Sequence, residues 1–212
     1  MPDHGGIIGC GRTDTGVHAR NFYAHFETAL PLIPNFLYKI NAVLPRDIAV
    51  YSCSEVPKDV HARFSAVRRR YTYHIHFRKN PFRNAYSVFH PYTLDADAMN
   101  VACVHLLGNQ DFTSFSKGQT QVKHNRCEVF SARWEIISEG MVFRIEANRF
   151  LRNMVRAIVG TLFTVGEGKA LPEKTEEVIA ARDRTAAGKS AHPQGLFLDH
   201  ITYPHIHGTS NR

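Results

Sequence analysis

The chain has 212 residues, 43% of them hydrophobic, and a formal net charge of +7. This length supports a sizeable core in one large or two small domains, and the excess of positive charge indicates a polyanionic partner, most simply a nucleic acid. No stretch is long and apolar enough to span a membrane, and the four cysteines are too widely spaced for a disulfide framework or a cysteine-rich zinc site, so we expect a cytoplasmic protein.

Residues 6–10 and 22–26 each have the composition of a short strand, and a loop with two glycines lies between them. The loop reads Gly-Arg-Thr-Asp-Thr-Gly-Val-His-Ala over residues 11–19 and contains Asp14, with Arg12 two positions before it. A carboxylate on a loop between two strands is a candidate acid, base or nucleophile, and the residues alone do not choose among these roles. An aspartate that merely closes a turn is the plainer alternative.

The next segment predicts a helix over residues 31–43, ended by Pro45, and then a strand over residues 48–51. The polar stretch 54–58 that follows is the best candidate for a domain boundary. We therefore expect an N-terminal half that ends at about this point.

A basic run leads into the clearest strand of the sequence. Residues 61–73 read His-Ala-Arg-Phe-Ser-Ala-Val-Arg-Arg-Arg-Tyr-Thr-Tyr, and residues 71–77 alternate between two faces, with Tyr71 and Tyr73 on the same one. Arginines beside an aromatic strand combine phosphate binding with a surface on which bases can stack. A solvated charge cluster next to a core strand is the alternative that composition alone favours.

The middle of the chain predicts one helix and two strands. Asp95 is placed to cap a helix that runs to about Leu107, with Gly108 as its stop signal. Strands are expected over residues 128–137 and 142–146.

A strong helix is predicted over residues 151–165, because its apolar residues form one broad stripe. Arg149, Arg152 and Arg156 are spaced so that they line one edge beside this stripe. A solvated basic edge is the plain explanation, and binding to phosphates or to an acidic side chain is the functional one.

The last part of the chain predicts a helix from Pro172 to Arg182, with an acidic first turn, and extended segments at residues 196–198 and 201–203. Strands and helices interleave without regular βαβ spacing, so the fold class is α+β with a largely antiparallel sheet.

Two alternating histidine pairs, His74 with His76 and His205 with His207, have the spacing of metal ligands. The spacing places no third ligand beside either pair, so we predict no metal site.

Several of these segments together resemble the TruA family of tRNA pseudouridine synthases. Residues 11–19 resemble the family's motif II, residues 61–73 its H-A-R-F-S-A…R-R-Y-x-Y segment, and residues 154–160 its motif III, M-V-R-x-I-V-G. Residues 195–198 resemble its G-L-x-L segment. The motifs stand in the family's order, and the resemblance covers residues 7–203, nearly the whole chain.

The resemblance implies the pseudouridine synthase fold, with two ferredoxin-like halves, a mainly antiparallel sheet and a central cleft. Thr15 stands where the family usually has alanine, and only ten residues precede motif II, where the family has a strand and a helix. The N-terminal half, residues 1–58, is therefore expected to be incomplete. Residues 59–204 would form the C-terminal half and complete the active site, and residues 205–212 a disordered tail.

Roles for individual residues follow from the same resemblance. Asp14 is the catalytic residue, Arg156 pairs with it, Arg63 helps to displace the target nucleotide, and Tyr71 packs on the flipped uracil. The substrate-binding residues implied in this way are Arg12, Arg63, Tyr71, Arg156 and Leu198, the last of which lines the uracil pocket. The residues expected to hold the RNA backbone are Arg68, Arg69, Arg149 and Arg152.

The implied reaction is the isomerisation of uridine to pseudouridine at positions 38 to 40 of the tRNA anticodon stem-loop, in a homodimer and without a cofactor. Asp14 either attacks C1′ or removes a proton from C2′. A non-catalytic RNA-binding protein is one alternative, because the basic and aromatic surface would serve it equally well. An aspartic protease is another, since Asp14-Thr15-Gly16 is that family's tripeptide, but its second carboxylate would have to come from another subunit.

Overall fold

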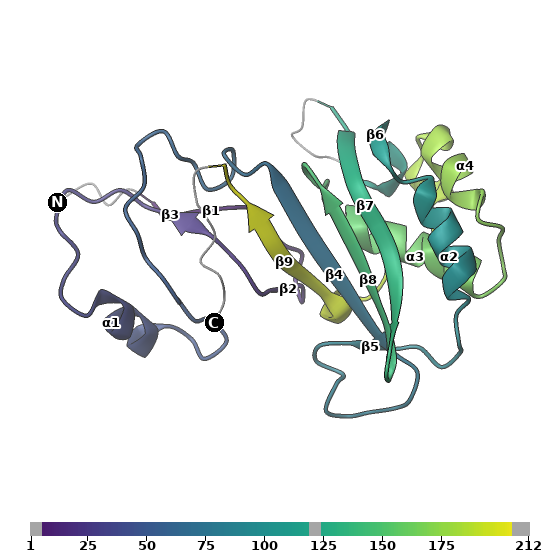
Figure 1. Ribbon diagram of the computed structural model, residues 1–212, viewed down its shortest axis with the longest axis horizontal. Coiled ribbons are helices and arrows are strands. Elements are labelled where there is room, and N and C mark those ends of the chain that lie inside the picture. Colours follow the sequence, from purple (N-terminus) through teal and green to yellow (C-terminus); the bar gives the residue numbers. More distant parts are fainter. Residues whose placement is uncertain (1–5, 119–123, 205–212) are drawn as a thin grey trace.

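A computed structural model describes residues 6–118 and 124–204. Its ribbon has two parts, a larger body built on one sheet and a smaller lobe beside it (Figure 1). The smaller lobe holds a two-stranded antiparallel sheet and one helix, namely β1 (Ile8–Gly9), β3 (Ala24–His25) and α1 (Phe36–Val43).

The body is built on a seven-stranded sheet with the order β2-β9-β4-β8-β7-β6, in which β5 pairs with β4. The strands are β2 (His18–Ala19), β4 (Arg68–His76), β5 (Val88–Phe89), β6 (Gly108–Asp111), β7 (Arg126–Ile137), β8 (Gly140–Ala147) and β9 (Leu196–Thr202). Neighbours are antiparallel except for β2 with β9 and β4 with β5. The expected α+β class with a mostly antiparallel sheet is therefore confirmed.

Three helices lie on one side of this sheet, and the last of them packs against the other two (Figure 1). They are α2 (Ala96–Val104), α3 (Met154–Gly166) and α4 (Lys174–Ala181), and short 3₁₀ turns lie at η1 (Thr113–Phe115), η2 (Arg184–Ala186) and η3 (Pro193–Gly195). The core between them contains Tyr73, Phe143 and Met154, each with no exposed surface. The alternation of β4 and the apolar stripe of α3 meet in this core, as their patterns predict.

The cap of α2 is confirmed, whereas its predicted end was wrong. The Asp95 carboxylate accepts a hydrogen bond from the Ala98 N–H at 2.9 Å. The helix ends at Val104, and Gly108 does not stop it but begins β6 with a φ of 89°. Glycine suits a backbone position with positive φ at the start of a strand as well as at the end of a helix. The residue type alone therefore does not distinguish the two.

The predicted strand over residues 48–51 is not formed, and this is a correction. The side chain of Asn41 binds both backbone groups of Val50, accepting from its N–H and donating to its carbonyl at 2.7 Å each. With these groups paired to a side chain, the segment has no ladder to join. Helix α1 also begins later than expected, after Asn35 with a φ of 59°.

The last predicted segments form one continuous strand, β9, in place of two. A bulge against Arg70 and Tyr71 interrupts its ladder at Asp199, which explains why the alternation of the sequence seemed to break there. The predicted tail, residues 205–212, lies outside the part of the chain that the structure describes. Within that part, none of the helices combines the length and the apolar character required to cross a membrane.

Candidate active site

Asp14 lies on the loop between β1 and β2, at a turn closed by a hydrogen bond from the Val17 N–H to the Asp14 carbonyl at 3.1 Å. Gly16 has a φ of 80°, and a Cβ on it would come 3.1 Å from the Pro193 side chain. Glycine therefore serves both the turn and the close approach of η3. The Asp14 side chain keeps 23% of its surface exposed, so it is accessible from solvent.

Arg156 reaches this carboxylate from the first turn of α3. Its Nη1 donates to Asp14 Oδ2 at 2.9 Å, and its Nε donates to the Ala191 carbonyl at 2.7 Å. The contact between Arg156 and Asp14 that the resemblance implied is thus present, between residues far apart in the sequence. Because the guanidinium is fixed at two points, it holds the carboxylate in one direction.

The segment that supplies the Ala191 carbonyl is itself fastened to α3. The Ala191 N–H donates to the Arg156 carbonyl at 2.9 Å, and Asn153 Nδ2 donates to Ser190 Oγ at 2.7 Å. A Cβ on Gly160 would overlap the Lys189 carbonyl oxygen, so the helix and the segment approach as closely as backbones can. The position of Arg156 therefore depends on both.

Tyr71 lies on β4, between Leu198 on β9 and Ile145 on β8. Its ring meets that of Phe150 edge to face at 5.1 Å. Burial raises the pKa of Tyr71 to about 12, and the nearby charge of Arg69 only partly opposes this. The hydroxyl is consequently neutral at physiological pH and makes no hydrogen bond with any residue that the structure describes.

Leu198 is 2% exposed and belongs to a small second core, separate from the main one. The buried members of this core are Cys10, Ala62, Leu198, Ile201 and Tyr203. They come from the residue directly after β1, the turn before β4, and β9 with the residue that follows it. The Leu198 carbonyl also accepts from the Arg20 N–H at 2.8 Å, which ties β9 to the chain just after β2.

Arg63 stands on a tight turn with its side chain exposed and its guanidinium 5.6 Å above the Phe64 ring. The His61 ring holds this turn, because its Nδ1 accepts from the N–H groups of Arg63 and Phe64 at 3.1 and 3.3 Å. The ring of His25 accepts from the Ala62 N–H at 3.1 Å. Sequence reasoning missed both histidines, since nothing in the local pattern distinguishes a turn-capping ring from a surface one.

The guanidinium of Arg69 donates hydrogen bonds to backbone carbonyls. Its Nη2 donates to the carbonyls of Arg63 at 2.7 Å and Cys10 at 3.4 Å, and its Nη1 donates to those of Asn148 at 3.1 Å and Ala66 at 3.4 Å. The two terminal nitrogens carry four N–H groups, and four acceptors surround them. This guanidinium joins the segment before Asp14, the Arg63 turn and the segment that leads into α3.

Arg68 points to the other face of the sheet, because neighbouring residues of a strand alternate. Its Nη1 donates to Glu146 Oε1 at 3.1 Å, and its guanidinium lies 4.2 Å above the Phe130 ring. Half of its side-chain surface, 50%, remains exposed. Tyr71 and Arg69 thus share one face, while Arg68 shares the opposite face with Arg70.

The remaining arginines of the predicted site are close in sequence to Asp14 or to Arg156. Arg12 and Arg152 are exposed, and their guanidinium groups bind no side chain in the described part of the structure. Arg149 is half-buried near Cys127, whose pKa is raised to about 11 by burial, with the arginine opposing that shift. All three lie within the two segments, 11–19 and 148–156, that meet at Asp14.

No group of three or more potential metal ligands occurs within residues 6–118 and 124–204. His74 contacts Thr72 and His76 contacts Ser87, each through one ring nitrogen, so these two side chains have hydrogen-bonding roles. The other predicted pair, His205 and His207, falls outside the described residues.

Comparison with known proteins gives one family model and many similar chains. Residues 102–204 match the model described as tRNA pseudouridine synthase. The chain is 46% identical to tRNA pseudouridine synthase A of Parabacteroides distasonis over 200 residues, which is 93% of this chain and 79% of that protein. It is 42% identical to tRNA pseudouridine synthase A of Bacillus pumilus, again over 93% of this chain, and 81% of that protein is covered.

Proposed function

Since this chain belongs to the tRNA pseudouridine synthase family, we propose that it isomerises uridine to pseudouridine in tRNA, at positions 38 to 40 of the anticodon stem-loop. The single observation that supports this best is the ion pair between Asp14 and Arg156, at 2.9 Å and within reach of solvent. This ion pair orients one carboxylate beside a basic surface. Rearrangement of a base in RNA requires both a reactive carboxylate and a surface that binds phosphates.

The reaction balances without a redox partner. The N1–C1′ bond of uridine breaks, the uracil turns, and a C5–C1′ bond forms, while a proton leaves C5 and another is gained at N1. Asp14 acts either as the nucleophile at C1′ or as the base at C2′. In both cases Arg156 directs the carboxylate, and the chemistry asks for no cofactor.

A uridine in a stem must leave its stack before its sugar can be reached. We propose that Arg63, exposed on a turn that is held by His61, fills the vacated space. The extrahelical uracil would lie between the neutral ring of Tyr71 and the apolar side of Leu198. We place it in a cleft between two ferredoxin-like halves, residues 1–58 and 59–204.

The RNA backbone would be held by arginines near this cleft, Arg12, Arg149 and Arg152, and at the outer face of the sheet by Arg68. Arg69 lies among carbonyls and is proposed to contribute indirectly, by keeping three segments of the site together. Displacing those carbonyls would cost hydrogen bonds that a phosphate contact would have to replace.

A homodimer in the cytoplasm is proposed on the resemblance alone. Sedimentation of the purified chain, alone and with tRNA, would test the dimer.

The non-catalytic alternative is less well supported, because RNA binding does not need a carboxylate fixed by an arginine. The protease alternative requires two carboxylates that share a proton. Among the described residues, the partner of Asp14 is a guanidinium.

The deciding experiment incubates the chain with an unmodified tRNA transcript and maps pseudouridine by carbodiimide modification and primer extension. We expect stops at one or more of positions 38 to 40. Binding of the transcript without any stop would support the non-catalytic alternative and contradict the proposal.

A further inference from the structure

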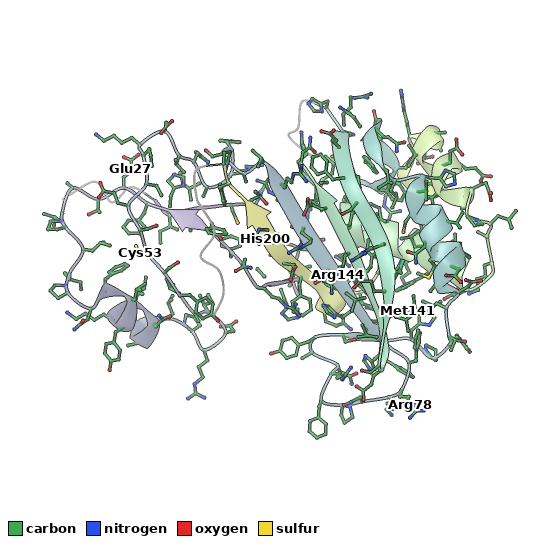
Figure 2. The ribbon with its side chains drawn as sticks, in the orientation of Figure 1. Glu27, Cys53, Arg78, Met141, Arg144 and His200 are labelled. Atoms are coloured by element: carbon green, nitrogen blue, oxygen red, sulfur yellow. The ribbon has the colours of Figure 1, made fainter. Side chains whose placement is uncertain are left out.

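The loop between β4 and β5, residues 78–86, carries exposed aromatic and basic side chains. Phe82 is 93% exposed and Tyr86 is 59% exposed. Arg78 and Lys79 are also exposed, and Figure 2 shows Arg78 on this loop, below the foot of the sheet. Exposed rings grouped on one segment, beside basic side chains, mark a candidate interaction site more strongly than a single exposed ring does.

The loop is ordered by its own hydrogen bonds. The Asn80 side chain accepts from the Phe82 N–H at 3.0 Å, and the Asn80 carbonyl accepts from the Arg83 N–H at 3.2 Å. A second turn closes from Tyr86 to Arg83 at 2.9 Å. Phe82 is therefore presented at a tight bend, which reduces the entropy lost when it binds a partner.

The loop also adjoins the candidate active site. His18, four residues after Asp14, forms a hydrogen bond between its Nε2 and the Ala85 carbonyl at 2.9 Å. Its ring lies 5.1 Å from that of Tyr86 and stacks on Phe197 at 4.7 Å. The loop therefore contacts β2, the strand that follows the catalytic loop.

The charged residues of the loop and of the segments beside it are all basic. Residues 77–94 contain two arginines and one lysine and no acidic residue. Arg83 forms an ion pair with Glu139 from the β7–β8 turn, which leaves Arg78 and Lys79 without an acidic partner in the described structure. One exposed ring beside two cations matches a nucleotide, which has an aromatic base and a phosphate. A protein partner would be expected to face a wider apolar surface.

We propose that residues 78–86 form a second RNA-binding element, in which Phe82 stacks on an unpaired base and Arg78 and Lys79 bind the adjoining phosphates. The proposal rests on the proposed function in taking tRNA as the RNA. It extends the contact surface from the reacting uridine to a neighbouring single-stranded part of the same molecule.

The affinity test uses the full chain and an unmodified tRNA transcript. Phe82→Ala should weaken binding about fivefold or more, the lower range for one stacked base. Tyr38→Ala is the matched control, because Tyr38 is 79% exposed on α1 in the smaller lobe, and it should bind like the parent.

The charge test compares salt dependence. The double change of Arg78→Ala and Lys79→Ala should make the slope of log affinity against log salt shallower by roughly 1.5 to 2. The same double change at Lys169 and Lys174, two surface lysines near α4 that are paired with glutamates, should leave the slope within error.

A spectroscopic arm reports the stacking directly. Phe82→Trp adds an exposed indole to a chain whose one tryptophan, Trp134, is 4% exposed. Saturation with the transcript should quench the new emission and protect it from acrylamide.

The parent is assayed first for binding and for pseudouridine. A parent that does neither would contradict the proposed function. A parent that does both, beside loop variants that match their controls and an indole that stays fully accessible with RNA bound, would overturn this inference alone.

Discussion

The body and the smaller lobe differ in how their apolar residues are used. In the body, Tyr73 and Phe143 are fully covered by the helices that pack on the sheet. In the lobe, α1 has no buried residue, and Val43 and Tyr51 are 81% and 85% exposed. The two parts have similar kinds of residues, but the main core lies in the body, and the small second core joins Cys10, directly after β1, to residues of β9.

The candidate active site is held in place by contacts from the body. Asp14 belongs to the segment that connects the lobe to the sheet, yet the body contacts its side chain and both ends of its loop. Arg156 is on α3, β2 pairs with β9, and Arg69 is on β4. A catalytic carboxylate can therefore be held accurately on a loosely packed segment if a rigid neighbour supplies the contacts.

The largest effect is expected from Asp14→Asn, which should lower the rate of pseudouridine formation by more than about 1,000-fold. The amide has nearly the same shape but can act neither as nucleophile nor as base. Transcript affinity, measured by filter binding, should stay within a few-fold of the parent. Turnover within tenfold of the parent would show that the aimed carboxylate is not the reacting group.

Next, Arg156→Met tests whether the body fixes the carboxylate. It keeps length and packing but removes both hydrogen bonds, and we expect a loss of kcat of about 100-fold. Arg156→Lys should fall between this variant and the parent, because lysine keeps the charge and loses the two-point contact. Equal rates for the two variants, at unchanged melting temperature, would mean that Arg156 does not act by orienting the Asp14 carboxylate.

A stability pair compares the two parts directly. Phe143→Ala should lower the free energy of unfolding by about 3–5 kcal/mol, as removal of a fully buried ring does. Val43→Ala should change it by less than about 0.5 kcal/mol, as is usual at exposed positions. Urea denaturation measures both. A large effect at Val43 would reveal that the lobe is packed against something in solution.

Arg69→Met should reduce kcat by about tenfold while leaving the salt dependence of tRNA binding unchanged, since the side chain holds backbone carbonyls. Arg68→Met is the matched control on the opposite face of β4, and it should lower the salt slope by about one. If the two variants instead shift the slope equally, Arg69 contacts phosphate and the site does not depend on it for alignment.

The last prediction concerns alkaline stability. The pKa of Tyr71 is raised to about 12 by burial, from about 10 in the unfolded chain. The unfolded state then releases a proton that the folded state keeps, so the free energy of unfolding falls as pH rises from 10 to 12. Tyr71→Phe should make this decline shallower by about 1.4 kcal/mol per pH unit. Identical slopes for the parent and Tyr71→Phe would mean that the Tyr71 hydroxyl is exposed to solvent in the folded protein.

Much of the body was predictable because its patterns are periodic. The alternation of β4 and the stripe of α3 depend on residues close in the sequence, and the bounds of both elements lie within three residues of those expected. The contact between Asp14 and Arg156 came from family resemblance, since no local rule links residues this far apart.

What could not be predicted depends on partners distant in the chain. Alternation alone places Arg68 and Arg69 on opposite faces, but not the four carbonyls around Arg69. In the lobe, residues 48–51 have the composition of a strand and lack a neighbour to pair with. Two-residue strands such as β2 and β5 leave no periodic trace at all.

The position of β9 within the sheet has a consequence for how the protein is made. This strand lies between β2 and β4, yet its residues leave the ribosome after Asp14, Arg63, Tyr71 and Arg156. The parallel pairing of His18 with Phe197 closes one of the longest loops in the chain, and such contacts form slowly. During synthesis, the strand that follows the catalytic loop would have no β9 to pair with until residues 196–202 emerge, so the loop would not yet be held in place. Catalytic competence is therefore expected to be acquired in a single late step.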